Sequence, residues 1–149
     1  MALQQDVMTA MKSAMKDKNQ TALAALRAIK SEILLAQTSG NGEDGLSEEE
    51  EIKILSKLVK QRKDSAAIYL EQDRNDLAEP ELAQAKVIGQ FLPAQLSEEE
   101  IEVVVKTTID KVGADGMKDM GKVMGMVNKE LAGKADGKTI SGIVKRNLV

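Results

Sequence analysis

Apolar side chains recur every three or four residues along almost the whole chain, which is the spacing that one buried face of an α-helix requires. The first two segments with this spacing are Leu3, Val7, Met8, Met11 and Met15, followed by Leu23, Leu26, Ile29, Ile33 and Leu34. The core must be aliphatic, because the 149 residues include only one Tyr and one Phe. Ala, Leu, Glu, Lys, Gln and Met are abundant, and all of them favour helices. The sequence therefore predicts an all-α protein.

Local signals predict where several helices begin. Asn19 can cap a second helix, and the short link before it favours an antiparallel helical hairpin. Ser47 with Glu50, and Ser97 with Glu100, each form the S-x-x-E pattern of a capping box. The residues from Thr38 to Gly45 are rich in Gly, Asn and Asp, which is typical of a loop. Gly113 is expected to end the helix that Ser97 begins.

The third helix is predicted to run to about Leu70, and Arg62 falls within its apolar stripe. Its predicted inward residues are Ile52, Leu55, Val59, Ala66 and Leu70. We expect Arg62 to pair with a carboxylate where two helices or domains meet; the alternative is a direct role in binding an anion. A fourth helix should begin with Pro80 in its first turn and stop before Pro93. Its predicted inward residues are Leu82, Ala85, Ile88 and Leu92.

These boundaries predict two domains. Residues 1–93 would form an N-terminal helical hairpin or bundle domain, and residues 94–149 a small C-terminal three-helix domain. The net charge of −3 is unevenly spread, because the residues from Lys106 onward carry nine basic and five acidic side chains. This basic excess permits an anionic partner without requiring one.

The stretch Asp119–Arg146 combines lysines with glycines inside a predicted helix. At about 100° per residue, basic and apolar residues fall on opposite sides: Lys118, Lys122 and Lys129 against Met120, Val123, Met124, Val127 and Leu131. Gly121 and Gly125 flank the lysine side, and each costs roughly 1 kcal/mol relative to alanine. Such glycines usually permit close approach, either of another helix or of a ligand backbone. Both alternatives stay open.

A second basic helix is predicted after the loop Gly133–Gly137. Lys134 and Lys138 flank its start, and Lys145 shares the exposed face with Lys138. A phosphate group could bind this helix end, where free N–H groups and the positive end of the helix dipole lie. Alternatively, Asp136 simply caps the helix and the lysines are solvated.

Two nucleotide-binding patterns are rejected on their context. Residues 40–45 spell G-x-G-x-x-G, but a helical segment precedes them, whereas a dinucleotide site needs a strand. Residues 132–139 differ from the P-loop pattern G-x-x-x-x-G-K-[ST] only in Ala132, which replaces the first glycine, but again no strand is predicted before them. We therefore expect no cofactor.

No catalytic centre or metal site is predicted. The chain has no Cys and no His, and the glutamate runs at 48–51 and 98–100 suit helix starts better than metal binding. No segment approaches the length of a membrane span, and the first residues do not begin a signal peptide. We expect a soluble, cytoplasmic protein.

Four motifs together carry a resemblance to a known family. They are KQRKDS (60–65), FLPAQLSEEEI (91–101), DMGKVMG (119–125) and GKADG (133–137). With them the chain resembles the YqeY, or GatB/YqeY, family over almost its whole length, from about Leu3 to Leu148.

The resemblance implies an all-helical, two-part protein whose C-terminal part is similar to the tail domain of the B subunit of the glutamyl/aspartyl-tRNA amidotransferase. The family is often labelled a carbon–nitrogen ligase with glutamine as amido donor, but this chain lacks a counterpart of the catalytic part. The implied partners are tRNA or a tRNA-handling enzyme such as the amidotransferase, with no DNA and no membrane.

The resemblance points to Lys122 and Lys134 as contacts, and helix geometry adds Lys118 and Lys138. The full predicted RNA-binding set is Lys118, Lys122, Lys129, Lys134, Lys138, Lys145 and Arg146, with Gly121, Gly125, Gly133 and Gly137 as close-approach glycines. The leading hypothesis is an RNA-associated accessory protein. The alternative is a helical protein-interaction module without RNA contact.

Overall fold

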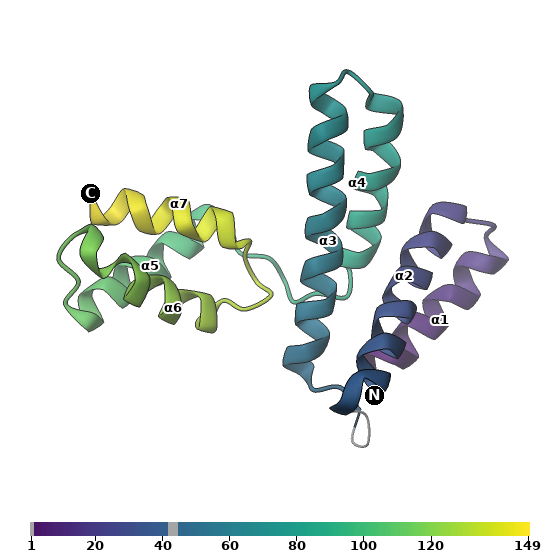
Figure 1. Cartoon of the computed structure of the whole chain (residues 1–149), viewed down its shortest axis with the longest axis horizontal. Coiled ribbons are helices and arrows are strands. Elements are labelled where there is room, and N and C mark those ends of the chain that lie inside the picture. The colour runs from purple at the N-terminus through teal and green to yellow at the C-terminus, as the bar shows by residue number, and fades with distance from the viewer. Residues whose placement is uncertain (1, 42–44) are drawn as a thin grey trace. The chain divides into compact units, whose positions relative to one another are not determined.

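The computed structural model describes residues 2–41 and 45–149, and these residues form seven α-helices and no strand (Figure 1). The all-α prediction is confirmed. The chain divides into two compact units, Met1–Leu92 and Pro93–Val149. The first unit holds α1 (Ala2–Lys16), α2 (Gln20–Ala36), α3 (Glu48–Glu71) and α4 (Asn75–Gly89). The second holds α5 (Glu98–Val112), α6 (Met120–Glu130) and α7 (Gly137–Leu148).

The first unit consists of two helical hairpins, α1 with α2 and α3 with α4, joined mainly through α2. The predicted helix starts are confirmed: Asn19 accepts a hydrogen bond from the N–H of Ala22, and Ser47 with Glu50 forms both bonds of a capping box. The core includes Leu26 of α2, Leu55 of α3 and Ile88 of α4. Hydrophobic burial along these shared faces holds the two hairpins together.

Several details of the first unit differ from the sequence-based expectations. The predicted loop from Thr38 is helical as far as Asn41, because residues Gln37–Asn41 form a π-helical turn. Of the G-x-G-x-x-G pattern, residues 42–44 lie outside the described residues. Leu34, Leu70 and Leu82 were expected to be buried but are 46%, 48% and 43% exposed.

The fourth helix begins earlier than predicted, at Asn75, so Pro80 lies inside α4. Proline lacks the N–H that would bond to the carbonyl four residues before it. This loss falls close to the helix start, where few intrahelical bonds have yet formed. The turn before α4 contains Asp73 in a left-handed conformation with φ 56° and an Arg74–Asp76 ion pair of 2.9 Å.

Arg62 lies where two helices meet, as expected, but its partner is not a carboxylate. Its Nε donates to Oε1 of Gln84 on α4 at 3.2 Å, and its Nη1 donates to the Leu58 carbonyl at 3.3 Å. Two neutral oxygens, one from an amide side chain and one from the main chain, therefore accept hydrogen bonds from this half-buried guanidinium. The contact ties α3 to α4.

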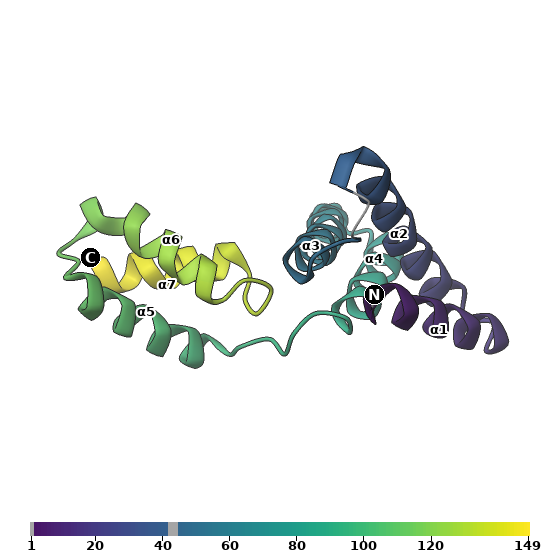
Figure 2. The same ribbon diagram turned by 90° about the horizontal axis from the view of Figure 1, so that it is seen from below.

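The second unit is a three-helix arrangement in which α5, α6 and α7 each contact the other two (Figure 2). Its core is built from β-branched and aliphatic side chains: Ile101, Val105, Val123, Val127, Leu131, Ile140, Ile143, Val144 and Leu148. The capping box at Ser97 and the left-handed Gly113 at the end of α5, with φ 65°, are confirmed.

Candidate nucleic-acid interface

The apolar seam of α6 points inward and fixes the direction of its basic side. Val123 and Val127 are fully buried, while Lys122 and Lys129 are exposed. Residues seven apart on a helix lie two turns apart on the same side. The two lysines therefore form a row on the outer side of α6.

Lys118 does not belong to the α-helical row that the sequence predicted. It lies in a 3₁₀ turn, Met117–Asp119, just before α6. The side chain of Asp119 accepts a hydrogen bond from the N–H of Asp115 at 2.8 Å, and Gly116 takes a positive φ of 108°. These local features make the chain enter α6 through a tight turn. The row on α6 starts at Lys122.

The glycines of α6 face open space. A Cβ atom placed on Gly121 or Gly125 would meet no atom within 4 Å apart from the helix's own backbone. Close packing of a neighbouring helix, one of the two alternatives, is therefore not the reason for these glycines in this structure. The main chain of α6 is left bare beside Lys122.

The loop between α6 and α7 is fastened to the segment before α5. Nε2 of Gln95 donates to the Gly133 carbonyl at 2.7 Å and to the Pro93 carbonyl at 2.9 Å, and the N–H of Leu96 donates to the Lys134 carbonyl at 2.9 Å. Gly133 has φ 76°, a left-handed conformation that glycine adopts without strain. These bonds hold the backbone of the loop that exposes Lys134.

The start of α7 is capped as the alternative interpretation predicted. Oδ1 of Asp136 accepts a hydrogen bond from the N–H of Lys138 at 3.4 Å. The carboxylate therefore lies at the helix end where a phosphate was considered, and its negative charge makes that end less favourable for an anion. Gly137 follows directly, and a Cβ atom there would meet no atom within 4 Å.

The exposed side of α7 carries Lys138 and Lys145, again seven residues apart. Gly142 lies between them on the same side, because four and three residues separate it from the two lysines. A Cβ atom at Gly142 would also meet nothing within 4 Å. Sequence reasoning missed Gly142, although its i, i+4, i+7 spacing with the lysines could have revealed it.

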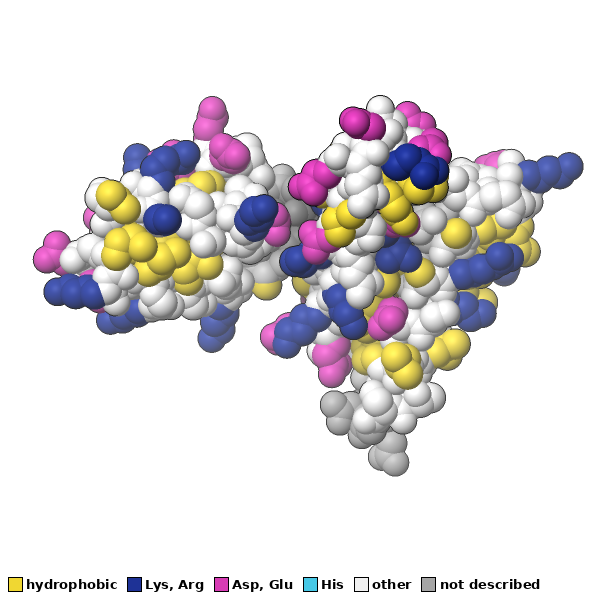
Figure 3. All heavy atoms as spheres, turned by 45° about the horizontal axis from the view of Figure 1, so that its top comes forward, with side chains coloured by type: hydrophobic (Ala, Val, Ile, Leu, Met, Phe, Trp, Pro, Cys, Tyr) yellow, Lys and Arg dark blue, Asp and Glu magenta, His cyan; other side chains and the backbone are white. Residues whose placement is uncertain are grey.

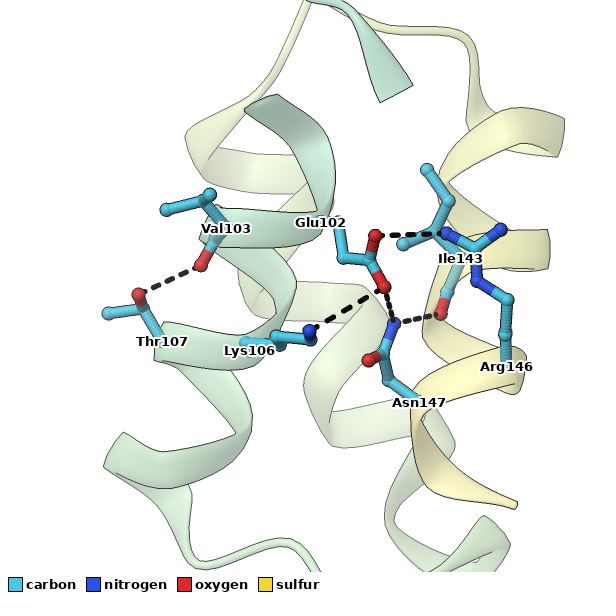
Figure 4. Close-up of polar contacts among 7 residues, drawn as sticks. All are labelled: Glu102, Val103, Lys106, Thr107, Ile143, Arg146 and Asn147. Carbon is cyan, nitrogen blue, oxygen red and sulfur yellow. Dashed lines mark hydrogen bonds and ion pairs between the residues drawn. The ribbon is translucent and has the colours of Figure 1, made fainter. Parts of the chain in front are cut away.

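Arg146 differs from the lysines because it already has a partner. Its Nη2 lies 3.2 Å from Oε2 of Glu102 on α5 (Figure 4). Oε1 of Glu102 also accepts from Nδ2 of Asn147 at 3.4 Å and lies 3.8 Å from Nζ of Lys106. This cluster joins α7 to α5, so a structural role accounts for Arg146.

The six predicted lysines are free of such partners. Among the residues that the structure describes, no ion pair engages the side chains of Lys118, Lys122, Lys129, Lys134, Lys138 and Lys145, and all six are exposed. The structure thus offers two outward faces, on α6 and α7, each with two lysines and bare helical glycine. Such faces can attract phosphates and let a backbone come close.

Comparison with known proteins identifies the family. A family model described as "Yqey-like protein" matches residues 4–148. The chain belongs to the Yqey-like protein family. A relative from Clavispora lusitaniae, named "Altered inheritance of mitochondria protein 41, mitochondrial", is 32% identical over 125 residues, which cover 82% of this chain and 72% of that protein. The protein of the same name from Pyrenophora tritici-repentis is 30% identical over 128 residues, covering 84% and 68%.

One relative of this Yqey-like chain belongs to an amidotransferase. It is the E subunit of the glutamyl-tRNA(Gln) amidotransferase of Thermococcus gammatolerans, which is 40% identical over 73 residues. That match covers 46% of this chain but only 12% of the relative. The resemblance to the family is confirmed, and an amidotransferase relative is found, although it is the E subunit where the sequence suggested the B subunit.

Two further features, a membrane-spanning helix and a metal-binding cluster, are not found among the described residues of this Yqey-like chain. No described helix is long and apolar enough to cross a membrane. In the same part of the chain, no group of three or more His, Cys, Asp or Glu side chains is placed to hold a metal ion. The lysine-bearing faces of α6 and α7 are thus the feature of the second unit that most needs an explanation.

Proposed function

We propose that this Yqey-like chain is an accessory protein that binds tRNA through the outer faces of α6 and α7 and catalyses no reaction of its own. The observation that carries the proposal is the bare helical backbone beside unpaired lysines, at Gly121 and Gly125 on α6 and at Gly142 on α7. The kinship with one subunit of a glutamyl-tRNA(Gln) amidotransferase supports tRNA as the nucleic acid. A cytoplasmic location is part of the proposal.

The residue chemistry suits folded RNA better than single strands. Proteins that bind single strands usually stack bases on aromatic side chains. The only aromatic residues, Tyr69 and Phe91, both lie in the first unit. Recognition of folded RNA through its shape and phosphates needs only cations and close backbone approach. The faces of α6 and α7 supply both.

Fluorescence anisotropy with labelled tRNA across a salt series tests the proposal. Phosphate contacts predict a steep loss of affinity as salt rises. The double variant Lys122→Glu with Lys138→Glu should lower the salt slope by about two, roughly one for each lost phosphate contact. Its affinity at low salt should fall by at least about tenfold.

A matched control keeps the same total charge. Lys57→Glu with Lys86→Glu changes two exposed lysines of the first unit, so the net charge shifts equally while α6 and α7 stay intact. Affinity should change less than about twofold if contacts are local. Absence of saturable binding at low salt, or equal losses in both double variants, contradicts the proposal.

The second candidate is a helical docking module without RNA contact. Met117 and Met126 of the second unit favour it, because their side chains are 43% and 37% exposed. Methionine is flexible and common at surfaces that accommodate different partners. Binding to purified amidotransferase that survives nuclease treatment, together with no tRNA binding, would support this candidate.

The family label of a carbon–nitrogen ligase is tested separately. Purified protein with glutamine, ATP and mischarged tRNA is expected to show no turnover, because no nucleophile with an activating base is recognisable in the described residues.

A further inference from the structure

The outer side of the α1–α2 hairpin exposes an unusual mixture of apolar and basic side chains. On α1, Met8, Lys12 and Met15 share one side at i, i+4 and i+7, and the two methionines are 47% and 55% exposed. On α2, Lys30 and Leu34 share one side, and Leu34 is 46% exposed. α1 has no extensive contact with α3 or α4, since it packs against α2. Among the described helices of the first unit, none packs over this face.

The two helices leave a recess between them on this face. It is lined by Gln4, Val7 and Met8 from α1 and by Lys30 and Ile33 from α2. Val7 and Ile33 are almost fully buried and form an apolar floor. Met8 and Lys30 are exposed and stand at its edges. Because Met8 of α1 and Lys30 of α2 line the same recess, the side of α1 that carries Met8 and the side of α2 that carries Lys30 belong to one continuous face.

The charges on this face have one sign. Lys12, Arg27 and Lys30 are exposed, and no ion pair of theirs is found among residues 2–41 and 45–149. The nearby carboxylates point away from this face. Asp6 lies two residues from Met8 on α1, and Glu32 lies two residues from Lys30 on α2, which places each about 200° around its helix. Figure 3 shows apolar and basic side chains side by side over α1 and α2, with acidic ones sparse.

We propose that this face of α1 and α2 is a docking surface for an acidic amphipathic helix of a partner protein. The apolar side of such a helix would lie over the small recess at Val7 and Ile33, against Met8 at its edge, and its carboxylates would lie against Lys12, Arg27 and Lys30. Flexible methionines at the edge allow the recess to adapt to different apolar side chains. The pattern is that of helix-in-groove recognition.

A membrane surface fits these observations less well than a helix. Binding at a bilayer relies on projecting apolar residues, commonly Trp, Phe and Leu, on a strongly amphipathic helix. Met8, Met15 and Leu34 do project from this face, but its apolar floor, Val7 and Ile33, lies recessed between two helices. Neither aromatic residue lies on α1 or α2. The surface belongs to the first unit, so the proposal stands independently of tRNA binding by the second.

Anisotropy with a fluorescein-labelled peptide tests the docking surface in the full chain. The probe is a synthetic peptide of Glu, Leu and Ala in amphipathic helical order, and its counterpart carries Lys in place of Glu. We expect salt-sensitive, saturable binding of the acidic peptide only. Lys30→Glu and Met8→Ser should each weaken it by about tenfold, a loss typical of a central contact.

Two charge-reversal variants serve as matched controls. Lys57→Glu changes an exposed lysine of α3, and Lys122→Glu changes one on the proposed RNA face; both should bind the acidic peptide like the wild type. Circular dichroism confirms that each variant is folded, which is expected because all the changed side chains are exposed. The proposal is overturned by equal binding of the basic peptide, or by equal losses in Lys30→Glu and Lys57→Glu.

Other occupants of the face give different results. Co-sedimentation with phosphatidylserine-containing vesicles that Lys30→Glu abolishes, without peptide binding, would assign the face to a membrane. Concentration-dependent dimerisation in sedimentation experiments that Met8→Ser abolishes would assign it to a second copy of the chain. Either result overturns a partner helix as the occupant.

Discussion

Replacing Gly125 with alanine is expected to stabilise the second unit, although glycine is the residue found there. Gly125 lies in the middle of α6 with helical backbone, and a Cβ atom added to it would meet no atom within 4 Å apart from its own helix. The substitution therefore creates no clash, and the difference in helix propensity, about 1 kcal/mol, should appear in full. Gly121 lies in the first turn of α6, where the N–H groups have no partner within the helix. Gly121→Ala should therefore raise the free energy of unfolding by less, about 0.5 kcal/mol.

Gly113→Ala provides a matched control with the opposite sign. A Cβ atom at Gly113 also meets nothing within 4 Å, but the residue has φ +65°. Alanine in a left-handed conformation costs roughly 1 kcal/mol or more. The two substitutions add the same methyl group to open space in the same unit. Any difference between them must come from the backbone conformation.

Urea denaturation measured with two probes separates the two units. Tyr69, the single tyrosine, lies in the first unit, so its fluorescence reports that unit alone, whereas circular dichroism reports the helices of both. Gly125→Ala should shift the dichroism transition to higher urea and leave the Tyr69 transition unchanged. A lower midpoint for Gly125→Ala, or an unchanged one for Gly113→Ala, would refute the reasoning.

The same variant should weaken the proposed tRNA binding while it strengthens the fold. If an RNA backbone approaches α6 at Gly125, the added methyl group lies in its way. Gly89→Ala in α4, which also has open space around it, is the control that should leave tRNA binding unchanged. A more stable Gly125→Ala variant with unaltered affinity would show that close approach at this glycine is not needed.

Three further substitutions have defined outcomes. Lys18 has φ 56° in the turn between α1 and α2, so Lys18→Gly should stabilise the first unit by about 1 kcal/mol, measured by Tyr69 fluorescence in urea. Hydrogen bonds from Arg74 lower the pKa of the Asp76 carboxyl. The ionised carboxyl should therefore stabilise the fold at neutral pH, and this stabilisation should be lost only as the pH falls through the lowered pKa. Arg74→Gln should raise the pKa of Asp76 again, measured by NMR titration. Gln95→Glu replaces an amide donor by a carboxylate facing two carbonyls, so the second unit should lose about 1 kcal/mol and the amides of the loop before α7 should exchange faster.

Helix starts could be predicted from the sequence where a cap is a local event. The side chains of Asn19, Ser47 and Ser97 each accept a hydrogen bond from the N–H three residues later. Both partners therefore lie within four consecutive residues, and the sequence alone shows them. The start of α4 has no such signal, because Arg74 precedes the helix without a side-chain cap bond. Pro80 is then the only local indication of a first turn, and it places the start five residues too late.

The extent of burial was harder to predict than helical periodicity. Leu70 and Leu82 have the spacing of core residues, yet both are largely exposed. Periodicity identifies an apolar stripe but does not show how many neighbours cover it. For the same reason the sequence could not decide whether a helix packs against Gly121. The open space around that glycine became evident only from the arrangement of α5, α6 and α7.

At four positions of this chain, glycine is either missing where the backbone favours it or present where the backbone favours alanine. The tight turns of the first unit put Lys18 and Asp73 at φ 56°, where glycine would be more stable. In contrast, α6 and α7 hold Gly125 and Gly142 in helical positions with open space, where alanine would be more stable. For a unit as small as the second, about 1 kcal/mol at each position is a large part of the total stability. Residues that lower the stability of the local backbone without improving the packing are expected where a surface serves binding. Both glycines lie beside exposed lysines that make no ion pair among the described residues, and no neighbouring helix packs against them. Their position is therefore what the proposed approach of an anionic partner to the main chain would require.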